Sequence, residues 1–254
     1  MRPSPFFPLR PGRRAVLLLL SSAAVAPGLA TAADATPDAA VHATQVPRSF
    51  TVLYQMQRGR ISGSSELGWK RTADGYEAHM TGKVAGFAVL DWASSGGFDA
   101  AGVAPRRYVE HRIGKGDRDA VFNRAEGRIG FSGKTDEVAL VPGAQDRLSW
   151  MIQLPAILAA DPAKAKAGTR ITLFVVGTRG HAENWIFESL GNDTIRTPAG
   201  TLKAVRWARK VGADDETQAE VWLDPTRHFL PVRLRLPLPP LDEPIEFNLA
   251  ETNP

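Results

Sequence analysis

Acidic side chains that could form a catalytic pair occur in two separate parts of the sequence. Glu183 and Glu188 fall in one predicted strand, and Asp91 and Asp99 lie in or next to another. Glycoside hydrolysis uses two carboxyl groups roughly 5–9.5 Å apart across a cleft. One hypothesis is therefore a cell-envelope hydrolase, although strand periodicity alone does not bring these residues to one cleft.

Other familiar catalytic patterns do not occur in the sequence. The chain contains no Cys, which excludes a Cys nucleophile and disulfides. No Ser lies in a Gly-x-Ser-x-Gly segment, and none is followed three residues later by Lys. The five His residues are scattered, and none has the spacing of a metal-ligand pair. We therefore expect no cofactor and no metal, and the sequence favours a protein that is not an enzyme.

Aromatic side chains are the remaining residues that could form a site, and most of them fall within predicted strands. A wide curved sheet can enclose a cavity, and aromatic walls would suit an acyl chain or the face of a sugar. The same side chains can equally pack a core, because each buries a large apolar area. The candidate ligand-binding residues are Tyr54, Trp69, Trp92, Trp150, Trp185 and Trp207.

The first 32 residues have the features of a secretory signal peptide. Four Arg residues precede Ala15–Ala26, a segment of apolar or small residues, and Ala30–Ala32 then offers small side chains to a signal peptidase. The apolar segment is shorter than the roughly 20 residues that span a bilayer. The sequence predicts a cleaved signal peptide over residues 1–32, a periplasmic location and no transmembrane segment after cleavage.

The charge balance argues against a nucleic-acid partner. The chain has 31 Lys and Arg against 27 Asp and Glu, and four of the Arg lie in the predicted signal peptide, which has no acidic residue. The rest of the chain is therefore formally neutral, whereas nucleic-acid binding needs a basic surface.

A mainly β domain is predicted over residues 49–251, after a leader (33–48) that is rich in Ala, Thr, Pro and Asp and is expected to be disordered. Within the domain, apolar and polar residues alternate with a period of two. Asp74-Gly75 indicates a hairpin turn, and Gly96-Gly97 a bulge. We expect a curved antiparallel sheet that forms a closed or half-closed barrel.

One segment departs from this alternation and predicts a helix. Leu148, Met151 and Ile152 would share one helical face, with Asp146 as the N-cap. Pro155 should kink or split the helix, and Pro162 should end it. We expect this helix to cover the mouth of the sheet.

The order of several short segments resembles a family of exported bacterial proteins, domain of unknown function 3108. The likeness covers nearly all of residues 49–251. It implies a signal-bearing, β-rich, barrel-like envelope protein, without a known activity or functional residue. The matching segments are Ser95-Gly96 after Trp92, Gly102-Val103-Ala104-Pro105 with Tyr108 and Arg112, Gln145-Asp146-Arg147-Leu148-Ser149, Thr197-Pro198-Ala199-Gly200, Glu220-Val221-Trp222-Leu223 and Leu230-Pro231-Val232-Arg233.

The leading functional hypothesis is a non-enzymatic envelope protein. It would bind an apolar or amphipathic ligand, a lipid or lipoprotein acyl chain, in the hollow of the curved sheet. The alternatives are the hydrolase with a carboxylate pair and a scaffold or assembly module without a small ligand. The sequence identifies neither the ligand nor the oligomeric state.

Overall fold

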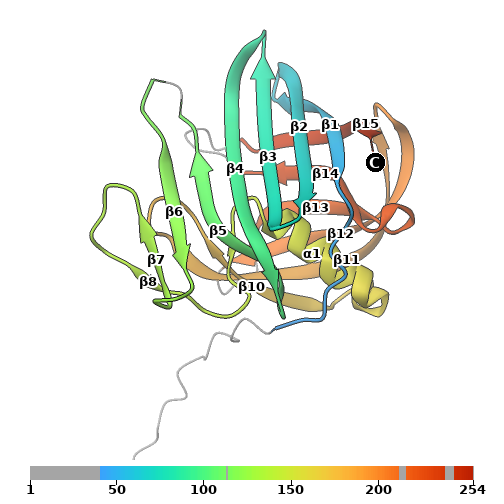
Figure 1. Cartoon of the computed structure of the whole chain (residues 1–254). Helices are drawn as coiled ribbons and strands as arrows, with labels where there is room; N and C mark the ends of the chain where they lie inside the picture. The colour runs from blue at the N-terminus through green and yellow to red at the C-terminus, as the bar shows by residue number, and fades with distance from the viewer. Residues whose placement is uncertain (1–40, 113, 212–215, 238–242, 254) are drawn as a thin grey trace, which may run out of the picture. The chain divides into compact units, whose positions relative to one another are not determined.

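The computed structural model describes residues 41–112, 114–211, 216–237 and 243–253, all of which belong to one compact unit, Thr36–Pro254. The predicted signal peptide (1–32) and the first part of the predicted leader (33–40) lie outside the described residues. The described residues form one α-helix, two 3-10 helices and fifteen strands (Figure 1). The helices are α1 (Trp150–Ala160), η1 (Pro162–Ala165) and η2 (Pro225–Arg227). The strands are β1 (Phe50–Arg58), β2 (Ile61–Thr72), β3 (Gly75–Val84), β4 (Phe87–Asp99), β5 (Gly102–Glu110), β6 (Arg118–Asn123), β7 (Arg128–Phe131), β8 (Val138–Ala139), β9 (Gln145–Asp146), β10 (Arg170–Val176), β11 (Ala182–Thr197), β12 (Gly200–Val211), β13 (Glu216–Asp224), β14 (Leu230–Leu236) and β15 (Ile245–Asn253).

All these strands belong to one sheet, in the order β8-β7-β6-β5-β4-β3-β2-β1-β15-β14-β13-β12-β11-β10-β9. Neighbouring strands are antiparallel, except that the short β9 runs parallel to β10. The first strand, β1, pairs with the last, β15, in the middle of this order. The sheet curves round on itself without closing through backbone pairing (Figure 1). The predicted mainly β, half-closed antiparallel fold with one helix is thus confirmed.

Side-chain amides, rather than a strand ladder, join β9 and α1 to the first half of β5. Within the described chain, β6 pairs with β5 only from Arg107 to Glu110, so the first half of β5 has no strand on that side. Gln145 Nε2 donates to Val103 O at 2.8 Å, and Val103 N donates to Gln153 Oε1 at 3.0 Å. Gln153 Nε2 also donates to Ala101 O at 2.6 Å. Both glutamines are buried, so these bonds satisfy backbone groups that water does not reach.

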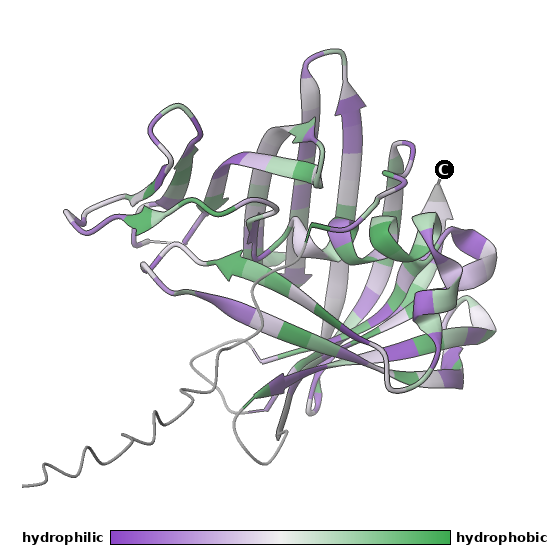
Figure 2. Cartoon of the chain, turned by 90° about the horizontal axis from the view of Figure 1, so that it is seen from below, coloured by the Kyte–Doolittle hydropathy of each residue, from purple (hydrophilic) through white to green (hydrophobic). Residues whose placement is uncertain are grey.

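The period-two pattern places alternate strand residues in the core, as Figure 2 shows along several strands. In β1, for example, Val52, Tyr54 and Met56 are buried and Gln55 is exposed. The predicted turn between β2 and β3 is present. A Cβ atom at Gly75 would lie 1.8 Å from Gly96 O, so this turn requires glycine. The predicted bulge in β4 falls between Ser95 and Gly96.

The helix lies inside the curve of the sheet instead of covering it with one face. All residues from Trp150 to Leu158 are buried, which is typical of a helix that is apolar all round. The helix is not split, because it runs through Pro155 to Ala160. Ser149, not Asp146, occupies the N-cap position. The Asp146 carboxylate nevertheless accepts hydrogen bonds from Leu148 N and Ser149 N in the preceding turn.

The end of the predicted disordered leader packs against the helix. Gln45 N donates to Ala156 O at 2.8 Å, and Trp69 Nε1 donates to Pro47 O at 3.3 Å. Residues 45–48 therefore form a strap between α1 and the start of β1. The amino-acid composition of this segment does not predict these contacts, because the strap is held mainly through hydrogen bonds of its backbone.

Candidate functional site

Two hollows lie at opposite ends of the strands. Phe50, at the start of β1, lines the first, and Arg58, at the end of β1, lines the second. We call the first, between α1, the strap and the start of β14, the α1 pocket. We call the second, which faces the β3–β4 and β10–β11 turns, the open hollow. Their volumes are about 820 Å³ and about 970 Å³, within the range of roughly 300–1,000 Å³ that is typical of ligand pockets.

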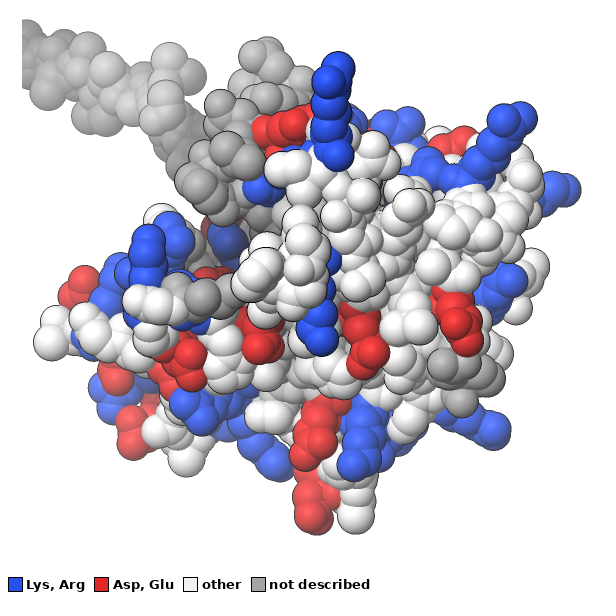
Figure 3. Space-filling view, turned by 90° about the horizontal axis from the view of Figure 1, so that it is seen from above, with Lys and Arg blue, Asp and Glu red and all other residues white. Residues whose placement is uncertain are grey.

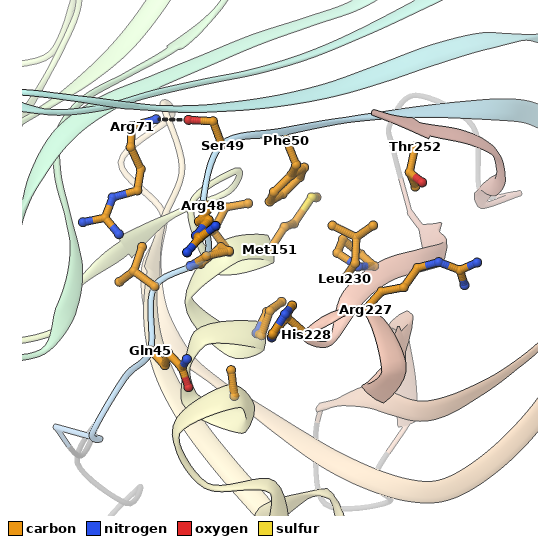
Figure 4. Close-up of a pocket in the computed structure, with 16 residues that line it drawn as sticks. Gln45, Arg48, Ser49, Phe50, Arg71, Met151, Arg227, His228, Leu230 and Thr252 are labelled. Carbon is orange, nitrogen blue, oxygen red and sulfur yellow. Dashed lines mark hydrogen bonds between the residues drawn. The ribbon is translucent and has the colours of Figure 1, made fainter. Parts of the chain in front are cut away.

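The walls of the α1 pocket are apolar and come from three segments distant in sequence. Figure 4 shows Phe50, Met151 and Leu230 around the cavity. The remaining apolar lining residues come from the same three segments and are Val46, Pro47, Ile152, Pro155, Ala159 and Pro231. Such a surface offers dispersion contacts and the hydrophobic effect, but few groups that could carry out chemistry.

The charged residues of the α1 pocket lining are all arginines. Arg48, Arg71, Arg227 and His228 line the pocket, and no acidic residue is found among the described lining residues. In Figure 4 the guanidinium groups of Arg71 and Arg227 lie toward opposite sides of the cavity. Arg227 pairs with the buried carboxylate of Asp224, and Arg71 lies 4.9 Å from the centroid of a Phe ring. Because Arg227 already has Asp224 as its partner, Arg48 and Arg71 are the residues that would favour an anionic group at the edge of an otherwise apolar cavity.

The turn that carries His228 has an unusual backbone. His228 and Phe229 have φ angles of 52° and 59°, in the left-handed region that non-glycine residues seldom adopt. Asp224 holds this turn, because its carboxylate accepts from Thr226 N at 2.8 Å and its carbonyl accepts from Phe229 N at 2.9 Å. The result is that Phe229 is buried in the core while His228 lines the pocket. Backbone strain of this kind is concentrated at ligand and active sites.

The open hollow combines apolar walls with charged residues of both signs. Met56, Val84, Leu90, Trp92 and Ile245 provide apolar surface. The charged lining residues are Arg58, Arg112, Lys115, Arg147 and Arg179, against Asp91, Glu110 and Asp117. Seen from this end, Lys and Arg side chains border uncharged surface, with acidic side chains among them (Figure 3).

A buried carboxylate lies behind the hollow, where β9 leads into α1. Asp146 is fully buried, and burial raises the pKa of its carboxyl from 3.8 to about 6. Its Oδ2 accepts from Ser94 Oγ at 2.5 Å, and that hydroxyl lies 2.9 Å from Tyr76 Oη. Asp146 lines neither hollow, so its bonds fix the β9–α1 turn rather than face a ligand.

The predicted aromatic residues lie mostly in the core. Tyr54, Trp69, Trp150 and Trp207 are at most 1% exposed, and Trp150 stacks on Phe187 with ring centroids 4.9 Å apart. The remaining two are 8% exposed. Arg209 lies 3.9 Å above the ring of one of them, Trp185, and the other, Trp92, lines the open hollow. None of the six lines the α1 pocket, and their role in ligand binding stays a prediction.

The carboxylates of the hydrolase hypothesis are not gathered in one hollow. Of the four, only Asp91 lines the open hollow, and none lines the α1 pocket. The others form ion pairs: Glu183 with Arg209 at 2.8 Å, Glu188 with Arg170 at 2.7 Å and Asp99 with Arg124 at 3.8 Å.

The described part of the chain contains no group of three His, Asp or Glu side chains that could hold a metal ion. It also contains no helix of the length and apolar character needed to cross a bilayer.

The residues at the rim of the α1 pocket were missed by sequence reasoning. Arg48 precedes the first strand, whereas Arg227 and His228 follow a Pro turn nearly 180 residues later. The sequence signal that was available is the apolar character of α1 on all sides, which indicates that this helix is surrounded by other elements.

Comparisons with known proteins give a family and a set of similar structures. No curated protein matches the chain. Twelve chains of solved structures match. One is a β-barrel-like protein of the domain of unknown function DUF1849 from Brucella abortus. It has 14% identity and a TM-score of 0.48, and the match covers 84% of this chain and 98% of the other. Another is a candidate exported protein with a YmcC-like fold from Bacteroides fragilis. It has 10% identity and a TM-score of 0.30, and the match covers 85% of this chain and 100% of the other.

The family model described as "Protein of unknown function (DUF3108)" matches residues 49–240, which include every element from β1 to β14, and the chain therefore belongs to this family.

Proposed function

We propose that the protein is an exported, non-enzymatic binder of an amphipathic ligand, and that an acyl chain of a lipid or lipoprotein lies in the α1 pocket with an anionic group at the rim. The observation that carries the proposal is the combination of apolar walls with the cationic side chains of Arg48, Arg71 and Arg227 and the imidazole of His228. The signal-like sequence of residues 1–32 supports export to the periplasm.

The expected binding free energy of the ligand follows from the apolar walls and the cationic rim of the α1 pocket. Each methylene group removed from water contributes about 0.8 kcal/mol, so an acyl chain gains affinity with every carbon that enters the pocket. The cationic rim adds selectivity for the sign of the head group, because an ammonium group would meet like charge there. We therefore expect fatty acids to bind more tightly than alkylamines of equal chain length.

Native mass spectrometry of protein purified from the periplasm tests the proposal directly. We expect a bound lipid, and we expect added palmitate to bind while hexadecylamine binds at least tenfold more weakly. Ala159→Trp should block the pocket, because Ala159 lines it. The matched control is Ala160→Trp, because Ala160 is exposed and lies outside the pocket lining. Equal palmitate binding by the two variants, or no lipid on the wild-type protein, would refute the proposal.

A further inference from the structure

Three polar groups on or beside the floor of the open hollow lack hydrogen-bond partners within the described chain. Two of them, the hydroxyl group of Thr178 and Nε of Arg209, are buried. The third is the guanidinium group of Arg147, which lines the hollow and is only partly buried. An unpaired buried polar group costs about 1–3 kcal/mol, and native proteins contain few of them. Two such donors beside the partly buried Arg147 indicate a ligand that accepts hydrogen bonds.

The position of Arg147 is fixed by its neighbours on both sides. Asp146 pairs with Val176 in the parallel ladder, which places Arg147 beside Gly177. A Cβ atom at Gly177 would lie 3.0 Å from Arg147 Nε. The buried Asp146 carboxylate and the N-terminal end of α1 hold the backbone on the other side. Arg147 is thus held in the lining of the hollow, where it makes no hydrogen bond or ion pair with any residue that the structure describes.

Thr178 follows in the same turn and is only 2% exposed. Gly177 N donates to His181 O at 2.8 Å, which closes the β10–β11 turn around the Thr178 side chain. Thr178 lines the hollow, and its hydroxyl oxygen is buried directly behind this lining without a partner of its own. It can therefore donate to a ligand without giving up a bond in the fold.

Electrostatics at this floor favour an anion. Arg209 is buried against the Trp185 ring and has Glu183 as its ion-pair partner. Its pKa is lowered by burial, and the nearby charge of Arg147 lowers it further, whereas Glu183 raises it. Two guanidinium groups thus lie close enough to repel each other.

The acidic residues of the hollow offset this positive charge only in part. Glu110 accepts a hydrogen bond from Tyr108 Oη at 3.3 Å, and Asp117 pairs with His111 at 2.9 Å. Asp91 also lines the hollow. The five Lys and Arg side chains of the lining therefore outnumber its three carboxylates.

We propose that the floor of the open hollow is an anion-binding site, in which Arg147 and the Thr178 hydroxyl donate hydrogen bonds to a phosphate or carboxylate group. The planar guanidinium group offers paired donors that match either oxyanion. Met56, Leu90 and Trp92 give the hollow an apolar wall on which a ligand body can lie. The site is at the opposite end of the strands from the α1 pocket and does not depend on the function proposed there.

Isothermal titration calorimetry of the full chain carrying Ala159→Trp tests this site while the α1 pocket is blocked. The probes are inorganic phosphate, octyl phosphate and octanol. We expect both phosphates to bind and octanol not to bind. Tighter binding of octyl phosphate than of inorganic phosphate would assign the site to a lipid head group, and equal binding to a free anion. Absence of binding by both phosphates would overturn the proposal.

Two substitutions separate binding from folding. Arg147→Gln should weaken phosphate binding at least tenfold, whereas Arg196→Gln, at the far end of β11, should leave it unchanged.

Thr178→Val keeps the shape of the side chain and removes only the hydroxyl group. We expect a three- to tenfold loss of affinity with a Tm equal to or above that of the unsubstituted chain, because no internal bond is lost. A lower Tm with unchanged affinity would show that the hydroxyl is structural and would contradict the proposal.

Discussion

The two ends of the curved sheet share the same strands but differ in what fills the interior. At the α1 end, the helix fills the interior, and the polar lining of the pocket consists mainly of residues from the strap and from the η2–β14 turn. At the other end, Trp92 and Leu90, each 8% exposed, line the open hollow together with Arg147 and Thr178.

The difference has a simple geometric origin. The 11 residues of α1 give a helix about 16 Å long, at about 1.5 Å per residue. The 10 residues of β3 and the 13 of β4 extend over about 33 and 43 Å, at about 3.3 Å per residue. One helix is therefore too short to fill the interior along the whole length of these strands. We infer that the open hollow is the space that the helix does not reach.

Removing one Trp from each end should give the largest difference in stability. Trp150→Ala should lower the free energy of unfolding by about 4 kcal/mol, because it removes a ring that is packed on all sides. Trp92→Ala should cost about half as much, because its ring faces the hollow and has fewer packed neighbours to lose. Urea unfolding of both variants measures the difference. Equal losses would mean that the open hollow is as closely packed as the α1 end.

The bonds that join the helix to β5 predict the next largest effect. Gln153→Leu removes the partner of both Val103 N and Ala101 O, and these buried groups would then be unsatisfied. We expect a loss of about 3 kcal/mol in the free energy of unfolding. Gln55→Leu, at an exposed position of β1, is the control and should change stability by less than about 0.5 kcal/mol. A small effect of Gln153→Leu would show that packing alone holds α1 in place.

Much of this fold could be predicted from the sequence, because many of its features depend on local sequence patterns. The period of two, the turn at Gly75 and the bulge at Gly96 depend on residues close together in the chain. The alternation of apolar and polar residues also places Trp69 and Trp207 on the inner face of the sheet. However, this alternation cannot distinguish a core residue from a residue in a cavity wall, because both face inward. The rim of the α1 pocket was not predictable, since Arg48 and Arg227 line the same pocket only because β1 and β14 lie on either side of β15. The role of Gln153, the one polar side chain of α1, likewise depends on a partner strand about 50 residues away.

The buried carboxylate between the two ends predicts a pH dependence. Because the pKa of Asp146 is raised from 3.8 to about 6 on folding, the folded state binds its proton more tightly than the unfolded state. Its contribution to stability is therefore greatest below about pH 4 and falls as the pH rises to about 6, by up to about 3 kcal/mol at 1.36 kcal/mol per pKa unit.

Asp146→Asn removes this titration, so the stability of the variant relative to the wild type should increase between pH 4 and pH 7. The exposed Asp136→Asn is a matched control. Urea unfolding at pH 4, 5, 6 and 7 measures the difference, and a constant offset between Asp146→Asn and the wild type would contradict the raised pKa.

The smallest expected effect on stability concerns a left-handed backbone conformation that occurs at both ends of the sheet. Ala85, in the β3–β4 turn beside the open hollow, has a φ angle of 49°, close to the 52° of His228 in the α1 pocket. Glycine adopts this region without steric cost, so Ala85→Gly and His228→Gly should each raise the free energy of unfolding by about 0.5–1 kcal/mol. Only His228→Gly should also change palmitate affinity, because it removes a hydrogen-bonding imidazole from the pocket rim. If His228→Gly stabilises the fold and leaves palmitate binding unchanged, the strained turn serves the packing of Phe229 and not a ligand.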